Sequence, residues 1–281
     1  MVKLAENRYG KSRVRMVHVK RLSGRHELRD WTVEVLLHGD YESCFIEGDN
    51  SKILPTDTMK NTVYSVARNS AASTMEEFAK ELISFLMSRN PQVSKVEAAI
   101  SDSPWDRATV GGLDHPTTFI QSSRETRTTT VTEQRGCDFS VVSGLANLII
   151  LKTAGSAFAG FIKDSLTTLP ETRDRLFGTA VNANWSYASA DLPFARLRAG
   201  IRDQLIATFA EHRSESVQHT LFEMAKKVLE QFSEIKDIHL IMPNKHCLLV
   251  DLSRFGQDNP NEIFVPTDEP HGYIEARVIR E

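Results

Sequence analysis

The sequence predicts an α+β fold with antiparallel sheets, made of one order of elements that occurs twice. Three observations predict it. Period-two alternation marks pairs of strands, period-3.6 patterns mark pairs of helices, and both halves follow the order strand, strand, helix, helix, strand, strand. Little residue identity joins the halves, so the repeat is one of architecture. We therefore expect one domain at residues 1–136 and another at 137–281.

The first half begins with two strands joined by the short link Ser23-Gly24-Arg25, which predicts a hairpin. Two helices follow. The second has a marked start, because Ser73 and Glu76 have the spacing of a capping box. The expected ranges are 13–22 and 28–37 for the hairpin, 57–68 and 74–89 for the helices, and 93–100 and 125–134 for the last two strands.

In the second half, Pro193 is expected to open one helix and Ser216 the next. Strands are expected at 139–151 and 179–190 before these helices, and at 235–242, 246–252 and 273–279 after them. Two long segments, 102–119 and 154–177, are rich in glycine, proline or small residues and are predicted as loops. Loops of this length in compact domains tend to serve a function.

Composition limits the function classes. The 281 residues carry a formal net charge of −3, so no basic excess indicates nucleic acid as a partner. No apolar run approaches the roughly 20 residues that span a membrane, and we expect no membrane partner. The three cysteines lie far apart, which argues against a disulfide framework. Together with an N-terminal stretch that lacks an apolar core, this predicts a cytoplasmic protein.

Several common catalytic signatures are absent from the sequence: a GxGxxG fingerprint, a phosphate-binding loop, HExxH and GxSxG. His18, His26 and His38 fall on the first hairpin, but their spacing is not that of a zinc site. A site without metal or cofactor is therefore expected. Sheet edges left open in each half also predict self-association into a closed assembly.

The stretch from Ile53 to Ala67 is the most informative one. An apolar run ends at Pro55, and Thr56-Asp57-Thr58 stand where a helix is expected to begin. Hydroxyls, a carboxylate and unpaired N–H groups then gather at one point, which suits a polar or anionic ligand. An ordinary N-cap is the alternative on the local pattern alone.

Further motifs, spread over almost the whole chain, connect this stretch to a known protein family. The sequence resembles the urate oxidase (uricase) family at several motifs in the same order. In the first half these are RYGK at 8–11 and TDTMKNT at 56–62. In the second half they are LKT at 151–153, Phe158, GF at 160–161, Asp164, TTL at 167–169, ET at 171–172, DR at 174–175, SVQ at 216–218, PNKH at 243–246 and FGQDNPNE at 255–262.

That resemblance implies the tunnelling fold, with two tandem antiparallel ββααββ units in each subunit. It further implies a homotetramer whose sheets form a barrel-walled tunnel, with active sites between subunits. One subunit would supply Lys11, Thr56 and Asp57. The other would supply Phe158, Arg175, Val217, Gln218, Asn244 and His246.

The resemblance also implies roles for these residues. Arg175 would grip the substrate through its fork of donors, Gln218 and the Val217 amide would bind an opposite edge, and Phe158 would stack on the ring. Lys11 would take a proton through the Thr56 hydroxyl, with His246 extending the relay. Asn244 would hold dioxygen or water. Urate, dioxygen and water would then give 5-hydroxyisourate and hydrogen peroxide.

Two alternatives stay open. The tunnelling fold also hosts pterin enzymes, so the chain could be a purine- or pterin-binding protein without redox activity. An assembly scaffold with a degenerate pocket is the other. Pro55, Gly155 and Arg173 depart from patterns seen in fungal members, which affects the expected activity level more than the expected reaction.

Overall fold

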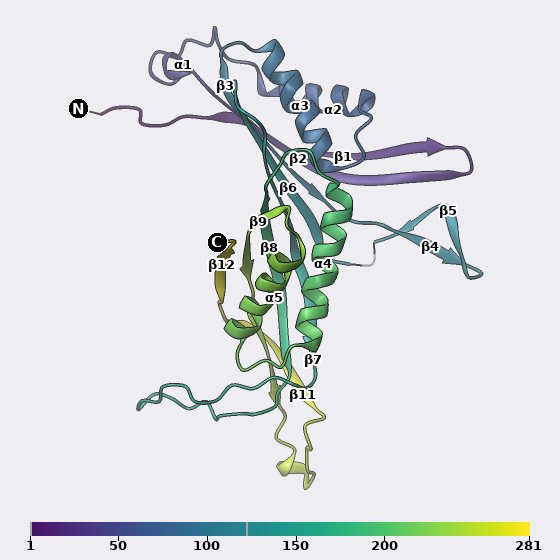
Figure 1. Cartoon of the computed structure of the whole chain (residues 1–281), viewed down its shortest axis with the longest axis vertical. Coiled ribbons are helices and arrows are strands. Elements are labelled where there is room, and N and C mark those ends of the chain that lie inside the picture. Colours follow the sequence, from purple (N-terminus) through teal and green to yellow (C-terminus); the bar gives the residue numbers. More distant parts are fainter. Residues whose placement is uncertain (1, 122) are drawn as a thin grey trace. The chain divides into compact units, whose positions relative to one another are not determined.

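The computed structural model describes residues 2–121 and 123–281, and its fold is α+β with antiparallel strands, as predicted (Figure 1). The chain divides into two compact units. The first unit comprises Met1–Gly144 and Ser186–Ala195, and the second comprises Leu145–Trp185 and Arg196–Glu281. The predicted division between residues 136 and 137 follows the repeat of element order rather than compactness and stays a prediction.

The first unit contains a sheet whose neighbouring strands are all antiparallel. Strands β1 and β2 form the predicted hairpin, and Gly24 at their turn adopts a positive φ of 76°. The strands follow one another in the sheet in the order β1 (Tyr9–Leu22), β2 (Arg25–Gly39), β3 (Val93–Asp102) and β6 (Thr126–Gln134).

Helices α2 (Thr56–Asn69) and α3 (Met75–Arg89) cover one face of this sheet (Figure 1). The alternation of β2 places Val33, Val35 and Leu37 on the buried face. The predicted apolar stripe of α3 is buried against it: Phe78, Leu82, Phe85 and Leu86 lie on this stripe, with Phe85 partly exposed. A short helix, α1 (Glu42–Ile46), lies in the β2–α2 connection and was not predicted.

The capping box of α3 is shifted by one residue from the predicted one. Thr74 is the N-cap and accepts from the Glu77 amide at 3.2 Å, while the Glu77 carboxylate accepts from the Thr74 amide at 3.1 Å. Ser73 donates to the same carboxylate at 2.8 Å. Both registers satisfy the sequence pattern, but burial of Glu76, which faces the interior, leaves Glu77 to close the box.

The expected loop at 102–119 is wrong in its central part. It contains a hairpin of β4 (Asp106–Val110) and β5 (Leu113–Ile120). Gly111 and Gly112 form its turn with φ of 61° and 80°. A two-residue turn with positive φ at both positions suits the twist of a hairpin, so the glycines join strands here instead of ending them.

The second unit follows the same order of elements. Its first two strands are followed by two helices, and α5 packs on β9 and β12. Pro193 directly precedes the first helix, and Ser216 caps the second as predicted. The elements are β7 (Ser140–Lys152), β8 (Phe177–Tyr187), α4 (Phe194–Glu211), α5 (Val217–Gln231), β9 (Ile235–Ile241) and β12 (Glu275–Ile279), with a few residues of β7, β8 and α4 lying in the first unit.

After α5 the chain forms several short strands, separated by breaks and loops. Met242 and Pro243 separate β9 from β10 (Asn244–Leu249), and both strands pair with β8. Strand β11 (Phe264–Gly272) pairs with β10 and was not predicted. It contains Pro266 and Pro270, which an edge strand tolerates because one row of its N–H groups needs no ladder partner.

Candidate active site

Helix α2 begins at Thr56 with open N–H groups. Pro55 stands at the cap position, and no side chain in the described part of the chain caps this helix. The first bond of the helix joins the Met59 amide to the Pro55 carbonyl at 3.1 Å. The amides of Thr56, Asp57 and Thr58 precede this bond, so the helix start can bind an anion.

Lys11 in β1 acts electrostatically on this helix start. The exposed Asp57 carboxylate receives the Lys60 ammonium at 2.5 Å and the Asn61 amide at 3.1 Å. The hydrogen bond from Lys60 is the main reason why the pKa of Asp57 is lowered, and the charge of Lys11 adds to it. Within the described residues, however, no hydrogen bond joins the Lys11 amine to the Thr56 hydroxyl.

Tyr9, two residues before Lys11, holds the chain that leads into α2. Its hydroxyl accepts from the Leu54 amide at 2.8 Å, and its ring meets that of Tyr41 edge-on with centroids 4.8 Å apart. Burial raises the pKa of Tyr9. Tyr9 belongs to the RYGK motif, but no pattern in the sequence predicts its hydrogen bond with the Leu54 amide.

Arg175 and Phe158 meet in the long segment between β7 and β8. The guanidinium carbon lies 5.3 Å from the centre of the ring, and burial lowers the pKa of Arg175. Its Nε is buried without a partner, and no carboxylate forms an ion pair with it, among residues 2–121 and 123–281. A half-buried cation without a counter-ion is costly, so this position fits a bound anion.

Backbone bonds hold both residues in place. Phe158 and Thr172 exchange two hydrogen bonds of 2.8 and 3.0 Å, and the Arg175 amide donates to the Ser156 carbonyl at 2.8 Å. The Phe158 ring also stacks on Phe161, with centroids 4.9 Å apart and planes 17° from parallel. The segment is thus an ordered loop, as its aromatic residues predicted.

Val217 and Gln218 open helix α5 close to this loop in the fold. The Ser216 hydroxyl accepts from the His219 amide at 3.1 Å, which leaves the two preceding amides outside the cap. Ser214 is bonded to the loop on both sides, accepting from the Ala157 amide at 2.7 Å and donating to the Gly155 carbonyl at 2.9 Å. The second unit therefore brings the segments of Phe158, Arg175, Val217 and Gln218 together.

Asn244 and His246 lie on β10, directly after the Pro243 break. Asn244 pairs with Thr179 of β8, and His246 pairs with Thr267 of β11 beyond a register shift. Both side chains are half-buried. In the part of the chain that the structure describes, neither forms a hydrogen bond with Arg175 or Gln218.

The nine predicted site residues thus fall into two sets. Lys11, Thr56 and Asp57 belong to the first unit, and the other six belong to the second. This division matches the one that the sequence resemblance implied for the two contributing subunits. Whether the two sets form one site stays a prediction.

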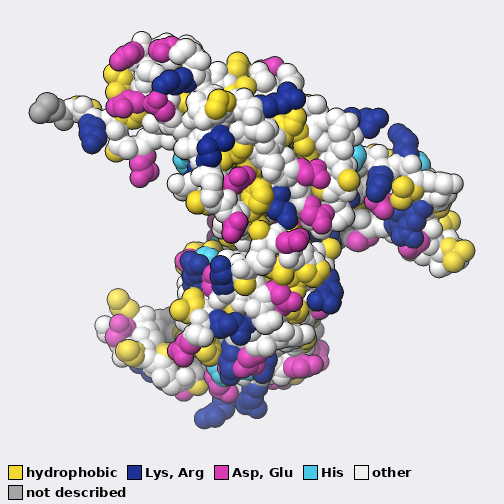
Figure 2. Space-filling model, turned by 45° about the horizontal axis from the view of Figure 1, so that its top comes forward, with side chains coloured by type: hydrophobic (Ala, Val, Ile, Leu, Met, Phe, Trp, Pro, Cys, Tyr) yellow, Lys and Arg dark blue, Asp and Glu magenta, His cyan; other side chains and the backbone are white. Residues whose placement is uncertain are grey.

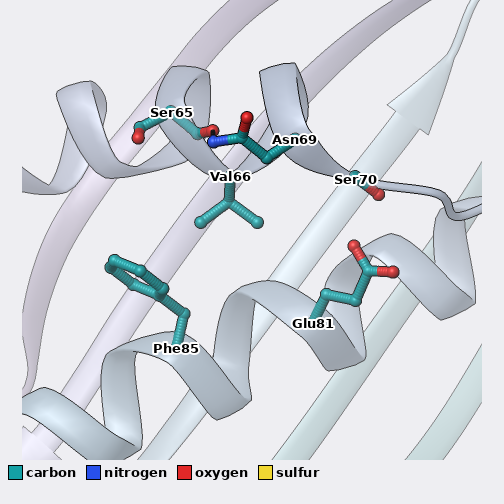
Figure 3. A pocket seen from close by; sticks show the side chains of 6 residues that line it. All are labelled: Ser65, Val66, Asn69, Ser70, Glu81 and Phe85. Atoms are coloured by element: carbon teal, nitrogen blue, oxygen red, sulfur yellow. Dashed lines mark hydrogen bonds between the residues drawn. The ribbon is translucent and has the colours of Figure 1, made fainter.

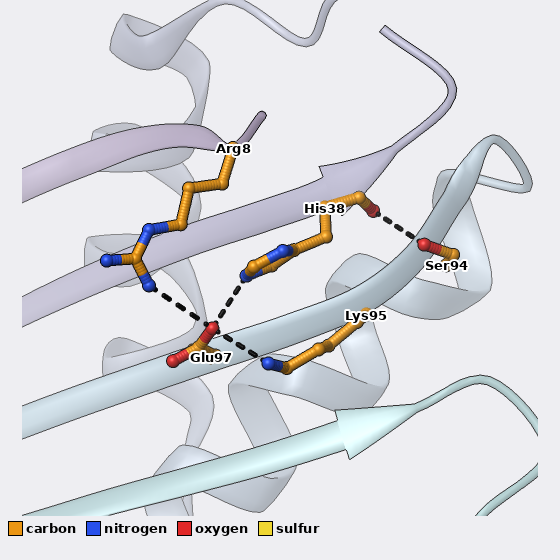
Figure 4. A network of polar contacts seen from close by, with 5 residues as sticks. All are labelled: Arg8, His38, Ser94, Lys95 and Glu97. Carbon is orange, nitrogen blue, oxygen red and sulfur yellow. Dashed lines mark hydrogen bonds and ion pairs between the residues drawn. The ribbon is translucent and has the colours of Figure 1, made fainter. Parts of the chain in front are cut away.

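Two other features of the first unit contain none of these residues. A pocket of about 250 Å³ lies between α2 and α3, where Val66 and Phe85 point toward one another (Figure 3). Elsewhere, one oxygen of the Glu97 carboxylate lies 2.6 Å from a ring nitrogen of His38, 3.0 Å from the Lys95 ammonium and 3.5 Å from the Arg8 guanidinium (Figure 4). Burial alone would raise the pKa of Glu97, but the bonds from Lys95 and His38 lower it.

The surface shows no broad area of one charge on the face in Figure 2, where acidic and basic side chains alternate. None of the described helices is both long and apolar enough to cross a membrane. Across residues 2–121 and 123–281, no three or more His, Cys, Asp or Glu side chains are grouped so that they could hold a metal ion.

Comparison with known proteins shows to which family the chain belongs. The family model described as "Uricase" matches residues 7–132 and 141–275. The chain belongs to the uricase family. It is 42% identical to the uricase of Arthrobacter globiformis over 280 residues, covering all of this chain and 91% of that protein. It is 38% identical to the uricase of Dictyostelium discoideum, covering all of this chain and 98% of the relative.

Solved structures of the uricase family agree with the fold. The crystal structure of Arthrobacter globiformis uricase has a TM-score of 0.94 at 41% identity and covers all of this chain and 96% of its own. A urate oxidase from Bacillus sp. TB-90 has a TM-score of 0.84 at 22% identity and covers 98% of this chain and all of its own, which supports the fold alone.

Proposed function

We propose that the protein is a urate oxidase that converts urate, dioxygen and water to 5-hydroxyisourate and hydrogen peroxide without a metal or flavin. The observation that carries this proposal is Arg175, a half-buried cation that lies over the Phe158 ring and has no carboxylate partner within the described residues. A flat, anionic heterocycle stacked on Phe158 would supply the missing charge and hydrogen-bond acceptors.

The amides at the start of α5 are proposed to bind a second edge of urate, together with the Gln218 side chain. Gln218 is exposed and can donate and accept at once, as a purine amide edge requires. Val217 is buried, so its contribution is restricted to its backbone N–H.

Proton removal is assigned to the helix start of the first unit. Lys11 takes a proton from urate through the Thr56 hydroxyl, and the open amides of Thr56 and Asp57 stabilise the negative charge that results. His246 extends this relay, and Asn244 holds dioxygen or water. Two electrons pass from the urate dianion to dioxygen, which leaves as hydrogen peroxide, and the oxygen of water becomes the new hydroxyl of the product.

We propose that the complete site forms between subunits of a homotetramer. This is supported by the division of the site residues between the two units and by exposed apolar residues on the β10–β11 hairpin, where Leu248, Leu249 and Val265 each expose about half of their surface. The cytoplasm is the proposed location, because all three cysteines are free thiols.

A urate assay on chelator-treated protein tests the reaction. Urate absorbance is expected to fall with matching dioxygen uptake in air, and to stay constant without oxygen. Tight urate binding without oxygen uptake would instead support the alternative of a non-redox purine-binding protein, and neither binding nor turnover would refute the proposal.

Mixing two impaired variants tests the shared site. Lys11→Met and Arg175→Met change different sets of residues, so a mixed oligomer contains some sites with neither substitution. At a urate concentration well below the KM of Arg175→Met, activity is expected to rise after the two proteins are unfolded and refolded together, but not after each is refolded alone. No recovery in a demonstrated mixed oligomer would place each site within one chain.

A further inference from the structure

Lys152, the last residue of β7, is a half-buried lysine that the proposed reaction does not use. Its ammonium donates to the backbone carbonyl of His212, where helix α4 ends. The amine also lies 5.8 Å from the centre of the Phe209 ring. Burial lowers the pKa of Lys152, which agrees with an amine held inside the fold rather than in water.

The carbonyl that Lys152 binds belongs to the turn before α5. His212 is tied to the helix behind it, since its amide donates to Thr208 at 3.0 Å. Two residues on, Ser214 donates through its hydroxyl to the Ser216 carbonyl at 3.0 Å. Lys152 thus holds the turn from which Val217 and Gln218 start.

The same turn is bonded to the loop that carries the other substrate residues. Ser214 pairs with Gly155 and Ala157, and Ser156 between them accepts from the Arg175 amide. Asp174 accepts from the Gly155 amide at 2.7 Å, and its charge acts on Lys152. Gly155 has a φ of 74°, and the chain bends at residues 153–155 before Ser156 pairs with Ser214 of the turn.

We propose that Lys152 is a positioning residue that sets the distance between the Arg175–Phe158 loop and the start of α5. This inference rests on the proposed function, in which these two segments hold opposite edges of the substrate. Its amine touches no substrate group and acts through the His212 carbonyl. Without it, each segment keeps its local bonds, but their mutual spacing is less strictly held.

Lys152→Met tests the proposal, because methionine keeps the length of the side chain and removes the donor. A clamp displaced by about 1 Å loses on the order of 100-fold in efficiency. We expect kcat/KM for urate to fall between about 10-fold and 100-fold, mainly through KM, and the Kd of the unreactive purine xanthine to rise by a similar factor. Lys152→Arg keeps a donor and is expected to recover most of both losses.

Lys227→Met is the matched control. Lys227 lies on the exposed side of α5, paired with Glu230 at 2.8 Å, and its replacement is expected to leave KM and xanthine binding unchanged. A purely structural lysine would lower the melting temperature but leave KM at its wild-type value. That result for Lys152→Met, measured well below its melting temperature, would overturn the proposal.

Backbone hydrogen exchange gives a readout that does not depend on urate. The amides of Ala157 and Ser214 are expected to exchange at least 10-fold faster in Lys152→Met than in wild type or Lys227→Met. Unchanged exchange would refute the positioning role even if the wild type proved inactive on urate, whereas faster exchange in an inactive protein would count against the proposed function alone.

If Lys152→Met does not fold, Asp174→Ala tests the same connection from the exposed side. Asp174 holds the Gly155 amide, and its loss is expected to raise KM and xanthine Kd in the same direction but by a smaller factor. Wild-type KM and xanthine Kd for Asp174→Ala, together with unchanged exchange of the Ala157 amide in that variant, would overturn the proposal.

Discussion

The guanidinium of Arg175 lies 5.3 Å from the centre of the Phe158 ring, and both residues are held by backbone bonds within one loop. Arg175→Met is expected to raise KM for urate roughly 10- to 150-fold with a smaller change in kcat, because a hydrogen bond to a charged group contributes about 1.5–3 kcal/mol. Steady-state kinetics check this. Arg173→Met, at an exposed neighbour, is the control, and an equal effect there would contradict the assignment.

At the start of α2, Thr56→Ala and Lys11→Met are expected to lower kcat by at least about 100-fold, the usual size of a general-base contribution. Thr56 is exposed, so the free energy of unfolding of the Thr56→Ala variant is expected to differ from that of the wild type by less than about 0.5 kcal/mol. Thr62→Ala makes the same substitution on the same helix and is expected to keep full turnover. Wild-type kcat in both Thr56→Ala and Lys11→Met would exclude the relay.

Tyr9→Phe removes the acceptor of the Leu54 amide while keeping the ring against Tyr41. We expect a loss of about 1 kcal/mol of stability, together with a lower kcat, because the entry to α2 is less well held. Chemical denaturation and kinetics measure the two effects. Tyr64→Phe, whose hydroxyl makes only a 3.4 Å contact, is expected to change neither. A stability loss with unchanged kcat would limit Tyr9 to a structural role.

The shifted capping box of α3 predicts unequal effects at neighbouring positions. Thr74→Ala is expected to lower the free energy of unfolding by about 1 kcal/mol, because it leaves the Glu77 amide without its side-chain acceptor. Ser73→Ala removes only an exposed bond to Glu77 and is expected to cost less than half as much. Equal losses, or a larger loss for Ser73→Ala, would favour the register that the sequence pattern predicted.

Asp30 is expected to make the stability of the protein sensitive to acid. Its buried carboxylate accepts hydrogen bonds from the Arg15 guanidinium at 2.9 and 3.2 Å and from the Trp105 ring N–H at 3.4 Å. The hydrogen bonds from Arg15 lower the pKa of Asp30 in the folded state. A lowered folded-state pKa means that this stabilisation is present above the unfolded value near 4 and is lost as the pH falls through the folded value.

Asp30→Asn is therefore expected to lower stability at pH 7 and to flatten the decline of stability below pH 4. Denaturation curves at pH 7, 4 and 3 measure both, with the exposed Asp191→Asn as control. An acid decline as steep as that of the wild type would show that Asp30 does not contribute to it.

Periodicity predicted most of the fold because each strand and helix buries one face. Its failures share a local cause. Gly111-Gly112 and the two prolines of β11 have loop character in sequence, yet a tight turn and an edge strand both accept them. The register of a cap depends on which glutamate is buried, and only the packed structure decides that between Glu76 and Glu77.

Motifs identified the candidate site residues, but they assigned no role to the residues that support them, even where Tyr9 and Lys152 lie within a motif. Lys152 binds a backbone carbonyl, and Ser214 binds two backbone groups, so neither contact has a side-chain partner that a sequence pattern could reveal. Tyr9 was visible only as part of a motif, since its partner is also a main-chain amide. The proposed joining of the two residue sets requires a second copy of the chain, so it stays a prediction.

Within the described residues, no side chain caps the backbone N–H groups of Thr56 and Asp57 in helix α2 or those of Val217 and Gln218 in helix α5. The peptide N–H is common to all residues except proline, so exchange of Thr56 or Val217 for another residue leaves the positive end of the helix intact. Most substitutions at these positions therefore leave the ability of the helix start to attract an anion unchanged. What evolution can readily alter is the choice among anions, through the few side chains that surround these two helix ends.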